Sequence, residues 1–371
     1  MATTLREIAA AAQTSASTVS RVLSGHPGIS AEVTAKVREE AKRLNYHGRS
    51  RRHGPDAVHI LAGKRIAVLT LGLDRSMVSV PAVASALHGA EEALGEVKAS
   101  VQIAHVTKPQ AVPPSLDLQA IDGAVLHAAM QGNQLETVGG RLLKRLRGVP
   151  TVWLLGRPRG GWGDAVASDD YQLGVLAAEH LVSFGHRHVA FVNPKPDHLL
   201  FMRREDGFLG AARRMGLNVK CFCQEPPGGW QQPWQAPTQV EAVQHLVDQA
   251  LSAKPRPTAI FAAADSIAAL IYRVLAIREI PVGREISVIS GNADHRLIAA
   301  LHPQLTTIDI HAHEIGRRAV DQLALRMASS SRLDSQWTVS PTLLEGESVL
   351  SPEIKPQDNS AVSPNDQRRR S

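Results

Sequence analysis

Residues 4–25 read TLREIAAAAQTSASTVSRVLSG and contain the pattern of two short helices joined by a tight turn. The stretch opens with a capping-box arrangement, a threonine followed three residues later by Glu7. Apolar residues then recur at helical spacing over residues 5–12, which predicts a first helix there. Ser15 follows a two-residue break and can cap a second helix over residues 16–24.

A third helix is predicted after the loop at residues 25–28. Ser30 can cap it, and apolar residues continue at helical spacing to about Asn45. Three helices with a minimal turn between the first two describe a helix-turn-helix domain. The second helix carries short hydroxyl side chains and Arg21, which suit phosphate oxygens and base edges. The alternative is a small helical cap that binds no ligand.

Positive charge is concentrated at the same end of the chain. Residues 1–65 hold 11 Lys and Arg against 5 Asp and Glu, so they account for the whole formal net charge of +6. A basic appendage on a neutral body is typical of proteins that bind a polyanion. The alternative on charge alone is an arm that only aids solubility.

Composition indicates a globular protein of two or three compact units, because 371 residues exceed one ordinary domain. The two cysteines, Cys221 and Cys223, argue against a disulfide scaffold and favour a reducing compartment. The first residues contain no apolar signal segment, and no uncharged stretch approaches the roughly 18 apolar residues of a spanning helix. We therefore expect a cytoplasmic, nucleoid-associated protein without a membrane partner.

From Lys64 onward, strand-like and helix-like segments alternate. Residues 65–71 form a continuous apolar run, as expected for a parallel strand that is covered on both faces. The alternation restarts near residue 173 with a second set of similar length. Two such sets predict two doubly wound lobes, with a cleft where the carboxyl ends of both sets of strands meet.

The segment from Thr4 to Gly25 resembles the headpiece of the lac repressor/purine repressor family of bacterial transcription regulators, and residues 17–23 are close to that family's signature. Core segments such as Arg204-Glu-Asp-Gly-Phe208 are similar to the family's periplasmic-binding-protein-like core. The similarity runs in order over roughly residues 3–350. It implies an all-α helix-turn-helix headpiece and a two-lobed α/β core with two doubly wound parallel sheets.

The resemblance also implies which headpiece residues bind DNA. The base-reading positions would be Ala16, Ser17 and Arg21. The positions that contact phosphate or orient the backbone would be Thr4, Leu5, Ser15, Thr18, Ser20, Ser24 and Tyr46. Because Ala16 and Ser17 are small, we expect weak direct readout at those two positions.

The junction after the headpiece departs from the family. Members place a short hinge helix there, and its leucine enters the minor groove. Here residues 49–63 contain several extra residues, and the usual Pro-Asn after Tyr46 is missing. Asp56 could cap a turn of helix that presents Leu61 as the wedge, or the segment is a flexible basic tether. Its arginines would aid phosphate binding in either case.

These expectations divide the chain into four segments. They are a DNA-binding headpiece at 1–48, a hinge or linker at 49–63, an effector-binding core at 64–350 and a disordered tail at 351–371. The resemblance implies three crossings between the lobes, with lobe one at about 64–167 and 296–328 and lobe two at about 168–295 and 329–350.

The resemblance places five effector-binding residues in the cleft, which are Asp169, Arg204, Trp234, Asp265 and Asn292. An arginine and carboxylates in one cleft can bind hydroxyls, ring nitrogens or carboxylates of a small metabolite. Trp230 is an alternative to Trp234, and a surface ion pair or turn cap is the alternative role for each residue. Asn292 stands where the family has a carboxylate, so the effector is expected to differ from those of sugar-responsive members.

The predicted function is sequence-specific DNA binding by a transcription regulator, in this family most often a repressor. A homodimer would bind a palindromic operator in double-stranded DNA, under control of a small-molecule effector, a sugar or related metabolite. The alternatives are a solute-binding protein without a DNA role and an enzyme, for which no nucleophile–base pair stands out. No cofactor is expected, and no metal, because His186, His188, His311 and His313 lack a second ligand cluster at zinc-like spacing.

Overall fold

The computed structural model describes residues 5–23, 31–43, 60–78, 80–107, 116–132, 135, 141–225, 240–331 and 333–352. The chain divides into two compact units, residues 1–55 and residues 56–371, and each is described by itself. None of the helices in the described ranges combines the length and the apolar character needed to traverse a lipid bilayer.

The first unit contains the helices α1 (Leu5–Ala11), α2 (Ala16–Leu23) and α3 (Ala31–Arg43). Ile8, Val19 and Val37 come from the three helices, and each is 0% exposed in their common core. Ser15 precedes α2 and caps it, because its Oγ accepts a hydrogen bond of 3.0 Å from the amide of Thr18. The predicted helix-turn-helix arrangement is confirmed.

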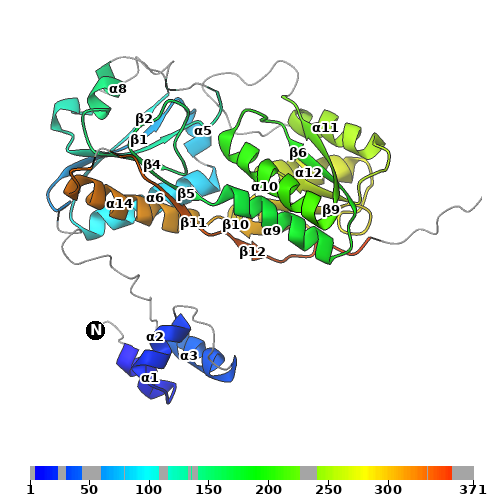
Figure 1. Ribbon diagram of the computed structural model, residues 1–371, viewed down its shortest axis with the longest axis horizontal. Coiled ribbons are helices and arrows are strands. Elements are labelled where there is room, and N and C mark those ends of the chain that lie inside the picture. The colour runs from blue at the N-terminus through cyan, green and yellow to red at the C-terminus, as the bar shows by residue number, and fades with distance from the viewer. Residues whose placement is uncertain are drawn as a thin grey trace, which may run out of the picture. The chain divides into compact units, whose positions relative to one another are not determined.

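The described residues of the second unit form two sheets, each with its own helices (Figure 1). The first sheet is parallel throughout, in the order β11-β5-β4-β3-β1-β2. Its strands are β1 (Arg65–Leu71), β2 (Ser100–Val106), β3 (Gly123–Ala128), β4 (Thr151–Leu154), β5 (Asp164–Ser168) and β11 (Gln336–Val339). The helices of this lobe are α5 (Arg75–Val78), α6 (Pro81–Glu96), η1 (Leu118–Ala120), α8 (Arg141–Leu146) and α14 (Ala312–Ala328).

The second sheet has the order β12-β10-β9-β8-β6-β7, and only β12 runs antiparallel to its neighbour among these strands. The strands are β6 (His188–Asn193), β7 (Asn218–Cys223), β8 (Ala259–Ala262), β9 (Ser287–Asn292), β10 (Thr306–Asp309) and β12 (Thr342–Leu344). The helices of this lobe are α9 (Asp170–Ser183), α10 (Leu199–Met215), α11 (Glu241–Ser252), α12 (Asp265–Ile277) and α13 (His295–Ile298).

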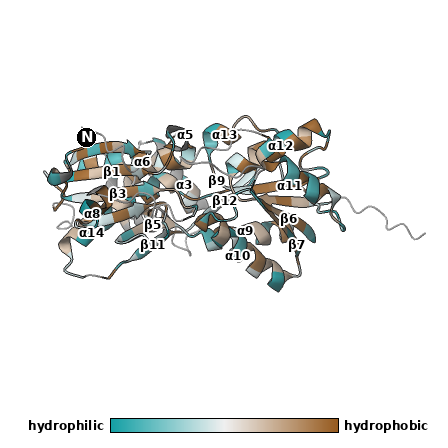
Figure 2. Ribbon diagram, turned by 90° about the horizontal axis from the view of Figure 1, so that it is seen from above, coloured by the Kyte–Doolittle hydropathy of each residue, from teal (hydrophilic) through white to brown (hydrophobic). Residues whose placement is uncertain are grey.

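Burial on both faces explains why the central strands are apolar. Every residue of β3, β4, β5 and β8 is buried, as the helix-covered faces of parallel sheets require. In Figure 2 the central strands are mostly brown, while teal collects on the outer sides of the helices. Three aromatic rings pack in the core of lobe two. The ring centroid of Phe261 lies 5.2 Å from that of Phe191 and 4.8 Å from that of Phe208.

The chain crosses between the two sheets three times within the described residues, as expected, but two boundaries differ from the prediction. β10 pairs in parallel with β9, so residues 296–310 belong to lobe two and not to lobe one. β11 pairs in parallel with β5, so residues 333–339 belong to lobe one and not to lobe two. β10 and β11 contain four residues each and β12 contains three, which is too short for an apolar pattern to assign them to a sheet.

Glycines allow two pairs of helices to approach closely. A Cβ added to Gly174 of α9 or to Gly207 of α10 would lie 2.0 Å from a carbonyl oxygen of the facing helix. At the contact between α6 and α14, the corresponding distances are 2.1 Å for Gly89 and 2.0 Å for Gly316. Each lobe therefore contains one pair of helices, α9 and α10 or α6 and α14, that can pack this closely only because glycine has no side chain at the contact.

Candidate functional site

The second helix of the headpiece, α2, presents the predicted recognition positions. Ser17, Ser20 and Arg21 stand at spacings of three and four residues, which places these positions on one side of the helix, and Val19 and Val22 are buried. Of the predicted DNA contacts, Thr4, Ser24 and Tyr46 lie outside the described residues. The side chains of Leu5, Ser17, Ser20 and Arg21 are likewise not described.

The side chains of three further predicted contacts in the headpiece are described. Ser15 is exposed, and its Oγ lies 2.9 Å from the Thr18 hydroxyl. Ala16 and Thr18 are half-buried. The Ser15 oxygen accepts the capping hydrogen bond from the first turn of α2, so this hydroxyl orients the helix.

Leu61, the predicted minor-groove wedge, lies in a turn at residues 60–63 and not in a helix. Its side chain is 1% exposed and belongs to the apolar core that includes Ile66 and Leu94. A side chain packed in this way is not available to DNA in this structure, because it would first have to leave the core. The rest of the predicted hinge, residues 49–59, lies outside the described residues.

A cavity of about 110 Å³ lies between the two lobes. Lobe one contributes the start of α6, the end of β3 with His127, and Leu155 directly after β4. Lobe two contributes the segment after β6 and the first half of α10, which include Lys195 and Arg204. The cavity therefore lies at the carboxyl ends of strands from both sheets, where doubly wound folds bind their ligands.

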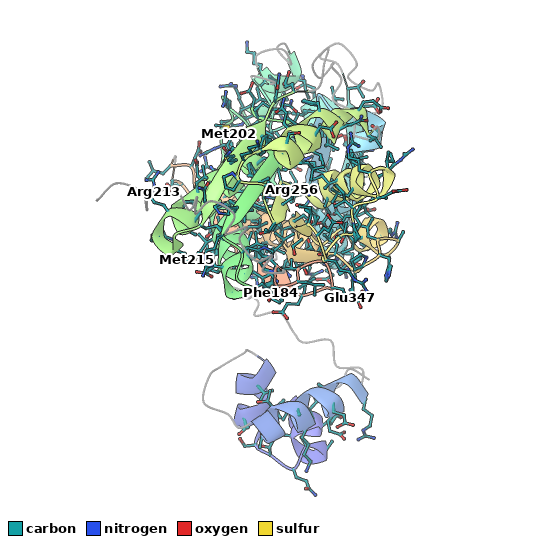
Figure 3. The ribbon with its side chains drawn as sticks, turned by 90° about the vertical axis from the view of Figure 1, so that its right-hand side faces the viewer. Phe184, Met202, Arg213, Met215, Arg256 and Glu347 are labelled. Atoms are coloured by element: carbon teal, nitrogen blue, oxygen red, sulfur yellow. The ribbon has the colours of Figure 1, made fainter. Side chains whose placement is uncertain are left out.

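Arg204 lines this cavity and is 2% exposed. Its Nε donates to Asp170 Oδ1 at 2.8 Å, one Nη donates to the carbonyl oxygen of Ala263 at 2.6 Å, and the other donates to Asn292 Oδ1 at 2.9 Å. Figure 3 labels Met202, Arg213 and Met215 of the same helix, and of these Met202 and Arg213 are exposed.

Asp170 is the functional neighbour that the sequence reasoning missed. Burial raises the pKa of its carboxyl above the ordinary value, and the guanidinium of Arg204 offsets only part of this rise. Asp169, the predicted cleft residue, instead caps α9, because its Oδ1 accepts from the amide of Gln172 at 3.0 Å. Helical spacing could have indicated that Asp170 is buried, because it lies three and seven residues before Leu173 and Ala177, on the buried side of α9.

Asp265 is 0% exposed and positions the loop that follows β9. Its Oδ1 accepts from the hydroxyls of Ser290 and Thr307, at 2.5 and 2.7 Å, and its Oδ2 accepts from the amide of Asp294 at 2.7 Å. Asp265 is absent from the cavity lining, whereas Ala264 and Ser266 belong to it. Three hydrogen bonds within the protein engage this carboxylate, so its place is to hold the loop after β9 beside the cavity.

Asn292 is held in an uncommon backbone conformation at the edge of the cavity. Its φ of 131° lies in a region that L-residues rarely adopt. The bond from Arg204 holds its side chain, and the bond from Asp265 to the amide of Asp294 holds the backbone that follows. Asn292 and Arg204, both predicted for the cleft, thus lie together at this cavity, and their role in effector binding stays a prediction. Trp230 and Trp234 lie outside the described residues.

Three basic side chains that were not predicted also line the cavity. Burial lowers the pKa of Lys195, which is 5% exposed, to about 8. The ring of His198 stacks on Phe201 with centroids 4.0 Å apart, and burial lowers its pKa well below the usual value. Burial also lowers the pKa of His127, whose Nδ1 lies 3.0 Å from the carbonyl oxygen of Leu154.

Asp294 connects the two lobes beside a wider hollow of about 760 Å³. Burial and the nearby Asp265 carboxylate raise the pKa of Asp294 to about 7, and hydrogen bonds from Asn292 and from the amide of Ala82 in α6 act in the opposite direction. Ala82 belongs to lobe one and Asp294 follows β9 of lobe two. Ionisation of this carboxyl therefore changes a contact between the lobes.

Replacement of Asp294 by Asn is expected to flatten the pH dependence of stability. The folded-state pKa lies above the ordinary 3.8, so the folded protein keeps a proton that the unfolded chain loses, and stability falls as pH rises towards 7. Urea unfolding measures the free energy of unfolding at about pH 5 and pH 8. The decrease between the two pH values should be smaller in Asp294→Asn than in the wild type, by about 2 kcal/mol. The exposed Asp206→Asn serves as control, and parallel curves for all three proteins would contradict the assignment.

One group of described residues has the geometry to hold a metal ion. The ligand atoms of His88, Glu92 and His313 all lie within 4.8 Å of one another, on α6 and α14. Glu92 accepts from His313 Nε2 at 2.9 Å and lies 3.2 Å from His88 Nε2. An ion pair of Glu92 with Arg317 at 3.8 Å shows that this carboxylate also links the two helices.

The comparisons with known proteins identify both units. The family model described as bacterial regulatory proteins, lacI family, matches residues 4–48. A periplasmic binding protein-like domain matches residues 178–349. The ribose operon repressor of Escherichia coli strain K12 is 26% identical over 348 residues, which cover 92% of this chain and 98% of that protein. The HTH-type transcriptional repressor PurR of Erwinia tasmaniensis is 26% identical over 358 residues, with 93% and 96% covered.

Solved structures of regulators share the fold. A complex of the transcriptional regulator CelR with cellobiose has a TM-score of 0.62 and 22% identity over 93% of this chain and 99% of that one. A lac repressor dimer bound to operator and the anti-inducer ONPF has a TM-score of 0.59 and 19% identity over 94% and 100%. The matched relatives are transcriptional regulators and not enzymes. The chain therefore contains a LacI-family DNA-binding domain followed by a periplasmic-binding-protein-like domain.

Proposed function

We propose that this protein is a transcriptional repressor that binds a palindromic operator as a homodimer and responds to a small molecule bound between its lobes. The observation that carries the proposal is the presence, in one chain, of a helix-turn-helix headpiece and a two-lobed unit with a cavity between its sheets. We place its action in the cytoplasm, at the nucleoid, because its DNA target is there.

The headpiece supports the DNA-binding part of the proposal. In α2, Ala16, Ser17 and Arg21 would read bases from the major groove. The DNA backbone would be contacted by Thr4, Leu5, Ser15, Thr18, Ser20, Ser24 and Tyr46. The charge of +6 favours approach to any duplex, so sequence selectivity has to come from α2.

The lobes support the regulatory part. Arg204 and Asn292 come from lobe two, and the cavity also includes residues of lobe one, so a ligand there would contact both lobes. A ligand that binds one arrangement of the lobes better than another shifts their equilibrium by its difference in affinity, commonly about 1–3 kcal/mol. In a dimer such a shift would change the spacing of the headpieces.

Replacement of Arg21 by Ala is expected to weaken operator binding by about 1–3 kcal/mol, because it removes a side chain suited to guanine edges or phosphate. The operator is first found by selection of genomic fragments with the purified full-length protein. Binding of Arg21→Ala is then measured by electrophoretic mobility shift at several salt concentrations.

Arg213→Ala is the matched control, since it removes an exposed arginine from lobe two. It should bind the operator as the wild type does. Unchanged affinity of Arg21→Ala would reject α2 as the recognition helix. Failure of the wild type to select any fragment would instead favour a solute-binding protein without a role on DNA.

A further inference from the structure

The lining of the cavity is mostly apolar, and its polar groups are rich in nitrogen. Its polar side chains are those of His127, Gln131, Lys195, His198, Arg204, Ser266 and Asn292. The remaining lining residues are apolar, among them Leu73, Leu155, Leu200, Phe201 and Ile310. No Asp or Glu lines it among the described residues. A ligand here meets hydrocarbon on most sides and nitrogen donors at one end.

This lining does not suit a neutral polyol. Each sugar hydroxyl carries a proton that needs an acceptor, and burial of such a group without a partner costs about 1–3 kcal/mol. No carboxylate of the described residues lines the cavity to accept these protons. Asp265 accepts from Ser290 and Thr307, and Asp170 accepts from Arg204 through Oδ1. Leu155 and Leu200 extend the lining with side chains that can neither donate nor accept.

Positive groups converge on the polar end of the cavity. Within the described part of the chain, Arg204 uses three of its five N–H groups, which leaves two for a ligand. The buried Nδ1 of His198 has no hydrogen-bond partner among the described residues. Lys195 and Arg204 both lower the pKa of His198, as expected where cations are gathered in a buried site.

We infer that the effector is a compact organic anion, whose charged oxygens lie against Arg204, Lys195 and His198 and whose apolar body lies against Leu73, Leu155 and Phe201. The cavity of about 110 Å³ is small beside the roughly 300–1,000 Å³ of pockets for drug-sized ligands, so the body is short. Carboxylates and phosphate monoesters share the required chemistry of several charged oxygen acceptors. The inference rests on the proposed function of the cavity as the effector site.

The test compares matched acids and alcohols with the purified full-length protein. Isovalerate and benzoate are the carboxylate probes, isoamyl alcohol and benzyl alcohol are their neutral counterparts, and benzyl phosphate and D-ribose complete the set. Thermal shift and calorimetry should show that an acid or the phosphate ester raises Tm and binds, with at least about tenfold higher affinity than the alcohol of the same shape. D-ribose should bind more weakly than the anions.

Lys195→Met keeps the length of the side chain and removes its charge, and should weaken binding of the anion about tenfold or more while the alcohols are unaffected. Lys220→Met removes an exposed lysine of β7 and should leave anion affinity unchanged. Equal or tighter binding of the neutral probes, no response to any anion, or unchanged anion affinity in Lys195→Met would overturn the inference. Operator binding without ligand is scored separately, so its loss would count against the proposed function and not against the class of effector.

Discussion

Gly89→Ala is expected to lower the free energy of unfolding of the two-lobed unit by about 3 kcal/mol, at the upper end of what overpacking usually costs. The added Cβ would lie 2.1 Å from the carbonyl oxygen of His313, and no real Cβ sits so close to a backbone atom. A backbone oxygen cannot rotate away as a side chain can, so α6 and α14 must move apart. Urea unfolding of the full-length protein, followed by circular dichroism, measures the loss.

Gly95→Ala is the matched control in the same helix. Its Cβ would have no heavy atom within 4 Å, and its backbone is not in the left-handed region. Alanine favours the helix over glycine, so this variant should gain about 0.4–1 kcal/mol. Opposite signs for the two substitutions would show that helix contact, and not helix propensity, determines the effect at position 89. A loss at Gly89 no larger than the change at Gly95 would contradict the close approach.

The headpiece could be predicted from sequence because its signals are local. Ser15 caps α2 through the amide of Thr18, and the buried Ile8, Val19 and Val37 lie within a short stretch of chain. Periodicity and capping depend on neighbours three or four residues away, so they can be recognised without knowledge of the tertiary structure.

The alternation of strands and helices in the core could be predicted for the same reason, but the assignment of edge strands to lobes could not. The pairings of β10 with β9 and of β11 with β5 depend on contacts between distant segments. A strand of four residues has no pattern that distinguishes one sheet from another. The three crossings were therefore expected correctly while two of their boundaries were wrong.

The site was predictable only in part, because its members act through partners that are distant in sequence. The resemblance gave Arg204 and Asn292, which the structure joins by a bond of 2.9 Å. It did not give Lys195 or His198, since a basic residue in a loop is ordinarily a solvated one. Their burial follows from the contact of the lobes, which no local pattern records.

Arg204→Met is expected to have the largest effect of the substitutions considered, with a loss of about 3–5 kcal/mol in the free energy of unfolding. Methionine removes the guanidinium that neutralises Asp170 in a site where the two side chains are 2% and 1% exposed. The variant also withdraws the donors to the carbonyl of Ala263 and to Asn292. A buried charge without its partner costs more than the pair contributes, so the loss should exceed that for an exposed arginine such as Arg213→Met.

The double variant Arg204→Met/Asp170→Asn separates the charge from the packing. With the carboxylate gone, no uncompensated charge remains, so the double variant should be more stable than Arg204→Met alone. It should bind the operator as the wild type does, because the headpiece is unchanged, but should no longer respond to the effector. Equal stability of the single and double variants would mean that Asp170 is not charged against Arg204. A retained response to the effector would remove Arg204 from the effector site even if the stability cycle behaved as expected.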